Sequence, residues 1–63
     1  MTGHEKFCLE NAVHFTAVRG LPFQRTRSAH ATLADAKAAA TGDGRTMIYA
    51  VTAAGHSAHI CNV

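Results

Sequence analysis

The amino-acid sequence predicts a small α+β domain: an antiparallel sheet of three to four strands with one α-helix packed on one face, in the order β(β)αββ. Three observations lead to this class. A hairpin pattern covers residues 46–61, a second alternating stretch covers residues 12–19, and a capped, alanine-rich helical segment covers residues 32–41. With 63 residues, the chain is expected to form a single domain.

The pattern in residues 46–61 is typical of a β-hairpin. Its first arm is enriched in β-branched and aromatic residues at a period of two, and the small residues Ala53, Ala54 and Gly55 form the turn. The two parities are Met47, Tyr49 and Val51 on one side and Ile48, Ala50 and Thr52 on the other. Residues 56–61 contain fewer large apolar side chains and two histidines. This second arm is therefore expected to be the more exposed strand.

Residues 12–19 alternate as a first strand, with Val13, Phe15 and Ala17 on one face. Because this face carries the aromatic ring, it is expected to point inward. Residues 20–22, Gly-Leu-Pro, should then form a loop or turn, since proline fixes φ and favours extended geometry in the residue before it.

Two stretches fit more than one structure. Residues 23–29 alternate arginine with polar residues and have no apolar face beyond Phe23, so both a short edge strand and an extended mobile loop fit; the edge strand is favoured. Residues 1–10 fit either a short helix at 4–10 with Phe7 as its apolar anchor or a flexible terminus.

The helix at residues 32–41 has recognisable signals at both ends. Thr32 supplies an N-cap hydroxyl, and Asp35 three residues later completes a variant capping box and meets the positive end of the helix dipole. The glycines in residues 41–44 end the helix. Its inward stripe is expected to consist of Leu33, Ala36 and Ala40, flanked by Ala39 or Lys37. Small side chains on this stripe would let the helix lie close to the sheet.

Composition narrows the classes of function. Six Lys and Arg against four Asp and Glu give a net charge of +2, too mild to indicate a polyanionic partner by itself. No apolar run approaches the roughly 18 residues of a membrane span, so no membrane partner is predicted and a cytoplasmic location is expected. Cys8 and Cys61 should stay reduced there. A homodimer would add buried area to a thin core.

Histidine and cysteine residues raise the question of a metal site. His56, His59 and Cys61 are close in sequence, and His4 and Cys8 could add two further zinc ligands. In a regular strand, however, His59 and Cys61 share a face while His56 points the opposite way. Their spacing also matches no zinc motif, so the sequence predicts no metal and no cofactor.

Cysteine–histidine pairs could also act as nucleophile and base, either Cys61 with His59 or Cys8 with His4. Catalysis would further require an oxyanion-binding group and a cleft, and so short a chain has little room for a pocket of several hundred cubic ångströms. The sequence predicts no catalytic residue and no enzymatic activity.

Arginines provide the remaining candidate site. Arg25 and Arg27 project from one face of a strand and, together with Arg45, could contact nucleic-acid phosphates. The first hypothesis for function is a small non-enzymatic interaction module that self-associates as a homodimer or binds a protein partner. The alternative is weak nucleic-acid binding through the arginine-bearing edge strand.

Overall fold

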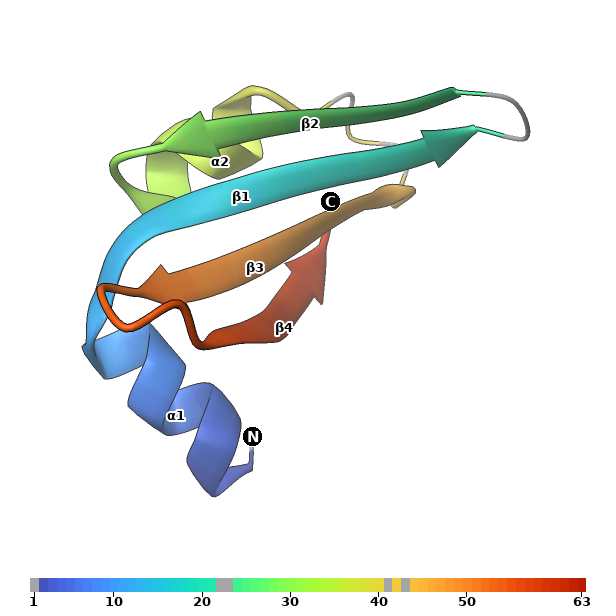
Figure 1. The fold of residues 1–63 in the computed structure, drawn as a ribbon. Coiled ribbons are helices and arrows are strands. Elements are labelled where there is room, and N and C mark those ends of the chain that lie inside the picture. Colours follow the sequence, from blue (N-terminus) through green and yellow to red (C-terminus); the bar gives the residue numbers. More distant parts are fainter. Residues whose placement is uncertain (1, 22–23, 41, 43) are drawn as a thin grey trace.

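The computed structural model describes residues 2–21, 24–40, 42 and 44–63. It confirms a small α+β fold with one four-stranded antiparallel sheet (Figure 1). In chain order the elements are α1 (Gly3–Glu10), β1 (Ala12–Leu21), β2 (Gln24–His30), α2 (Leu33–Ala38), β3 (Thr46–Thr52) and β4 (Ser57–Asn62). The strand order β2-β1-β3-β4 places β1 and β3 in the centre and leaves β2 and β4 at the edges.

Both predicted strand regions form hairpin arms. The β3–β4 hairpin turns at residues 53–56, where Gly55 has a φ of 89° and its N–H donates to the carbonyl of Thr52. Strand β4 is more exposed than β3, as predicted. The favoured edge strand is β2, which pairs with β1 from Phe15↔His30 to Leu21↔Gln24. Of the predicted loop at residues 20–22, Gly20 and Leu21 extend β1 instead, and Pro22 lies outside the described residues.

Helix α2 packs on β1, β2 and β3. The predicted inward stripe is confirmed at Leu33 and Ala36, whereas Ala40 lies beyond the end of the helix. Ala36 is fully buried in the core, and Leu33 packs against the same cluster. The Thr32 hydroxyl accepts a hydrogen bond of 3.1 Å from the N–H of Asp35. The helix ends at Ala38, earlier than predicted. Two glycines follow it with positive φ, and Thr41 and Asp43 of the predicted stop lie outside the described residues.

At the N-terminus the structure has the helix, and a capping box explains where it begins. The Thr2 hydroxyl accepts from the N–H of Glu5, and the Glu5 carboxylate accepts from the N–H of Thr2. The predicted anchor was wrong: Phe7 is 50% exposed, whereas Cys8 is completely buried. The thiol lies on the helix face that packs on β3 and β4, where a small side chain permits close approach.

The two helices cover the same face of the sheet, α2 against the β1–β2 side and α1 against the β3–β4 side (Figure 1). Cys8 from α1 and Ala36 from α2 belong to one buried cluster with residues of the sheet. The sheet residues of this cluster are Phe15, Ala17, Ile48, Ala50 and Ala58. Among the parts of the chain that the structure describes, the largest fully buried side chains are Ile48 and Cys8, so the core is thin.

One residue predicted to point inward, Val13, does not, because β1 contains a bulge. Phe15 and Ala17 point into the core as expected, but Val13 is 57% exposed. Ala12 pairs with Thr52 and His14 pairs with Val51, so two steps along β1 match one step along β3. The extra residue, Val13, therefore drops out of the alternation that would have turned it inward.

We predict that Thr32→Ala lowers the free energy of unfolding by about 1 kcal/mol, because the N–H of Asp35 loses its capping partner. Urea denaturation followed by far-UV circular dichroism measures this change. Thr32→Ser keeps a hydroxyl and should retain most of the stability; equal losses in the two variants would show that the cap contributes nothing.

Candidate functional site

The face of the sheet opposite the helices carries the candidate site. Residues paired directly across antiparallel strands project on the same side. Val18 of β1 pairs with Arg27 of β2 on one side and with Met47 of β3 on the other. Thr16 of β1 pairs with Tyr49 of β3, and Tyr49 in turn pairs with His59 of β4. We call this surface the open face; it consists of His14, Thr16, Val18, Arg25, Arg27, Ala29, Met47, Tyr49, Val51, Ser57, His59 and Asn62.

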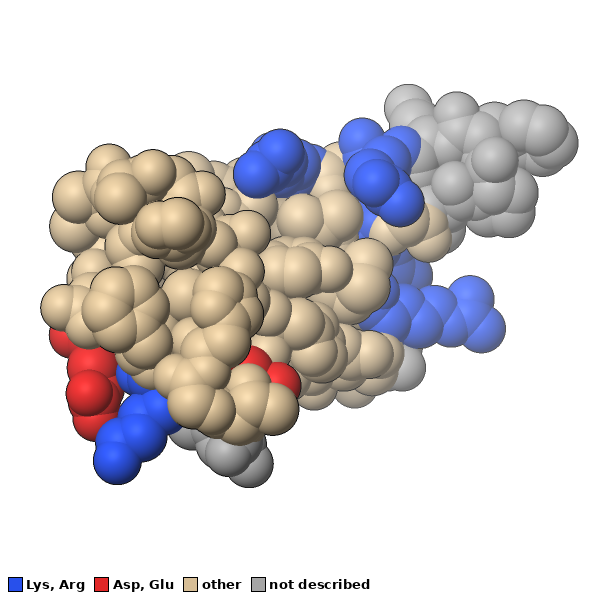
Figure 2. All heavy atoms as spheres, turned by 60° about the horizontal axis from the view of Figure 1, so that its bottom comes forward, with Lys and Arg blue, Asp and Glu red and all other residues tan. Residues whose placement is uncertain are grey.

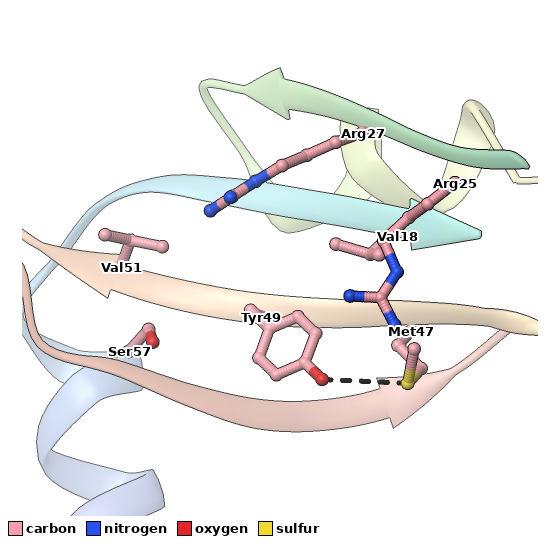
Figure 3. Close-up of a pocket in the computed structure, with 7 residues that line it drawn as sticks. All are labelled: Val18, Arg25, Arg27, Met47, Tyr49, Val51 and Ser57. Carbon is pink, nitrogen blue, oxygen red and sulfur yellow. Dashed lines mark hydrogen bonds between the residues drawn. The ribbon is translucent and has the colours of Figure 1, made fainter. Parts of the chain in front are cut away.

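A hollow of about 230 Å³ lies on the open face (Figure 3). Arg25 and Arg27 extend from β2 across β1, and Val18 is buried beneath them. The remaining lining residues are Met47, Tyr49, Val51 and Ser57. The hollow thus has an apolar lining contributed by the two central strands and a cationic border contributed by β2.

Tyr49 occupies a central position on the open face and is held by its neighbours. Its hydroxyl donates to the Met47 sulfur at 3.6 Å. Its ring meets the His59 ring edge-on, with centroids 5.6 Å apart and an interplanar angle of 69°, and His59 hydrogen-bonds Asn62. Figure 3 shows the flat side of the tyrosine ring turned outward from the sheet. The ring is therefore a fixed aromatic platform on this surface.

The open face is cationic because it has arginines and no carboxylates among the residues that the structure describes. Arg25 and Arg27 are exposed. The described acidic residues, Glu5, Glu10 and Asp35, lie on the two helices instead. Figure 2 shows most of the basic side chains separated from the acidic ones by a broad uncharged surface. An anionic group would meet attraction on the open face without a competing carboxylate.

The structure brings Arg25 and Arg27 together but places Arg45 elsewhere. Arg45 is exposed just before β3 and does not line the hollow. Arg19 lies on the helix-covered side, where it borders a second depression beside Ala39 and Thr46. The arginine cluster of the hollow is therefore the predicted pair on β2.

Both edges of the sheet are blunted, which favours the open face over the edges as the binding surface. Strand β2 carries Arg25 and Arg27, and charges on an edge strand oppose pairing with another strand. Strand β4 contains a bulge at residues 59–61. At the start of β4, His4 Nε2 from α1 lies 3.0 Å from the carbonyl oxygen of Ser57. This contact satisfies one backbone acceptor of the edge strand.

The bulge in β4 also overturns the predicted arrangement of His59 and Cys61. Cys61 pairs with Ile48 and packs against the core, whereas His59 pairs with Tyr49 on the open face. Two residues that would share a face of a regular strand thus lie on opposite faces. They cannot act together as nucleophile and base.

The second cysteine–histidine pair is close but inaccessible. The Cys8 sulfur lies 3.8 Å from His4 Nε2, yet the cysteine is completely buried, so a substrate cannot reach the thiol. In the described part of the chain, no three His, Cys, Asp or Glu side chains gather as metal ligands would.

Comparison of the chain with models of protein families, with curated proteins and with solved structures finds no match. None of the described helices is long and apolar enough to cross a membrane.

Proposed function

We propose that this protein is a non-enzymatic binding module that takes up nucleic acid on its open face, with Arg25 and Arg27 neutralising backbone phosphates. The observation that carries the proposal is the placement of both arginines at one border of a hollow on a face without carboxylates among the described residues. Two residues of one strand have Cα atoms about 6.6 Å apart, so the backbone positions of Arg25 and Arg27 suit the presentation of two neighbouring positive charges to a polyanion. A cytoplasmic location, as expected for two reduced cysteines, belongs to this proposal.

We rank nucleic-acid binding above self-association because of the charge on the open face. Two copies joined through the open face would each bring Arg25 and Arg27 into the interface, and the described residues of that face include no carboxylate to pair with them. Like charges across an interface oppose association. A phosphate backbone supplies the missing negative charge.

Binding of fluorescent 12-mer oligonucleotides, measured by anisotropy at several salt concentrations, tests the proposal. We expect dissociation constants of about 1–100 µM at physiological salt, the range of sequence-independent binding, and tighter binding at lower salt. Two phosphate contacts predict a slope of about −1.4 for log K against log salt with single strands. Arg25→Ala/Arg27→Ala should bring this slope close to zero.

The matched control is Lys6→Ala/Lys37→Ala, because it removes the same amount of charge from the helix-covered side. It should keep the wild-type slope. An equal loss in both double variants would mean that only net charge matters, and no anisotropy change at tens of micromolar protein would end the proposal.

A homodimer through the open face, or another protein partner there, is the second candidate. It is favoured by the thin core and by the half-buried side chains of Met47, Tyr49 and Val51, which a partner would cover. Sedimentation separates the two candidates: Arg25→Ala/Arg27→Ala should strengthen a homodimer by removing repulsion, whereas it should weaken nucleic-acid binding.

A further inference from the structure

We infer that the open face selects single-stranded over duplex nucleic acid, with one base stacked on Tyr49. This inference rests on the proposed function and adds the form of the ligand and the residue that recognises it. It follows from the size of the hollow, the orientation of the tyrosine ring and the distribution of apolar and cationic groups around that ring.

The hollow accommodates one flat group and little more. Its volume of about 230 Å³ lies below the roughly 300–1,000 Å³ of pockets that enclose whole small molecules. Val18, Met47 and Val51 make its lining apolar, as suits the faces of a base. Figure 3 shows Arg25 and Arg27 crossing β1 from β2, so that their guanidinium groups reach the hollow, where the phosphates next to an inserted base would lie.

The ring of Tyr49 is preorganised for stacking in the absence of a ligand. The hydrogen bond to the Met47 sulfur and the edge contact with His59 fix the ring, so little side-chain freedom is lost when a base covers it. The side chain of Tyr49 is half-buried, and Figure 3 shows the flat side of its ring turned outward. Stacking of unpaired bases on aromatic side chains of a sheet is a general mode of single-strand recognition.

A duplex cannot use this platform. Its bases are stacked on one another and paired, so their flat faces are hidden, and a shallow sheet surface reaches only the backbone. A duplex would contact Arg25 and Arg27 but leave Tyr49 unused. Single strands should consequently bind more tightly than duplexes of the same sequence.

The chain offers a direct readout, because it contains one tyrosine and no tryptophan. Intrinsic fluorescence of the wild-type protein therefore reports on Tyr49 alone. We would titrate it with a thymidine 12-mer, with an abasic 12-mer of equal phosphate number, and with a 12-base-pair duplex, using free tyrosine to correct for absorption by the nucleic acid.

We expect the thymidine 12-mer to quench the emission and to bind about 5- to 150-fold more tightly than the abasic strand, the range for stacking of one base. The abasic strand and the duplex should leave the emission unchanged. Equal affinity for the thymidine and abasic strands, with unchanged emission, would overturn the inference while leaving phosphate binding by the arginines intact. Absence of binding by all three ligands would instead overturn the proposed function itself.

Two variants refine the test through anisotropy. Tyr49→Phe keeps an aromatic ring and should retain the preference for the thymidine strand, whereas Tyr49→Leu keeps apolar volume and should lose it. A Tyr49→Leu protein that is folded by circular dichroism and keeps the full preference would contradict stacking. If that variant does not fold, the wild-type titration with the abasic strand decides the question.

Discussion

Ile48→Ala is expected to leave a substantial fraction of the protein unfolded at 25 °C. Ile48 is completely buried on the central strand β3, between Ala17 of β1 and Cys61 of β4. Removing its outer carbons leaves a cavity in the centre of the core and should cost about 2–5 kcal/mol. A chain of 63 residues has a total stability of roughly 3–9 kcal/mol at 0.05–0.15 kcal/mol per residue. The loss is therefore comparable to the whole stability.

Urea denaturation of wild type and variant, followed by circular dichroism, measures this effect. Ile60→Ala is the matched control, because it makes the same substitution in a half-buried residue of the edge strand β4. It should cost clearly less. Equal losses at both positions would show that Ile48 is not the centre of the core.

Ala36→Leu should destabilise the protein by about 1–3 kcal/mol through overpacking. Ala36 is completely buried where α2 lies on β1, β2 and β3, so a leucine has no space unless the helix moves away from the sheet. Alanine and leucine have similar helix propensities, and the helix itself is not weakened by the substitution. The expected effect thus reports on the distance between helix and sheet.

Ala34→Leu controls for this experiment, since Ala34 is exposed on the same helix. It should change the free energy of unfolding by no more than about 0.5 kcal/mol. Thermal and urea denaturation of both variants provide the comparison. An Ala36→Leu protein as stable as Ala34→Leu would mean that α2 does not depend on a small side chain to approach the sheet.

Elements with strong local signals could be predicted from the sequence. Thr32 and Asp35 mark the start of α2, and the period-two pattern of β3 marks a strand, because both signals depend on neighbouring residues alone. For residues 1–10 the prediction left a helix and a flexible terminus open without using the capping box of α1, and that box alone would not settle the choice, since a short helix needs packing to persist. Burial of Cys8 against β3 and β4 supplies that packing.

Bulges account for the main errors in side-chain direction. Val13 lies exposed and Cys61 lies opposite His59 because one extra residue in β1 and one in β4 shift the alternation. A bulge depends on how two strands meet, and that register is absent from the pattern of either strand taken singly. Alternation alone therefore assigns faces correctly only up to the first bulge.

The candidate site was likewise predictable only in part from the sequence. Arg25 and Arg27 could be paired from their alternation on one strand, but Tyr49 joined them only through the cross-strand pairing of β1, β2 and β3. The parity of Tyr49 with Met47 and Val51 was visible in the sequence. The sequence does not show which face of the sheet the helices cover. The position of Tyr49 beside the two arginines therefore could not be predicted.

By itself the sequence determined the α+β class, the helix at Thr32, the strand character of the hairpin and the spacing of the two arginines, since each depends on residues within a few positions of one another. Only the tertiary structure decided that α1 joins α2 on one face, that the bulges turn Val13 and Cys61, and that Tyr49 lies in a cationic hollow. These outcomes depend on the packing of segments far apart in the chain. Cys8 of α1 and Ala36 of α2 pack into one buried cluster on the same face of the sheet, and their small side chains let both helices approach that face closely.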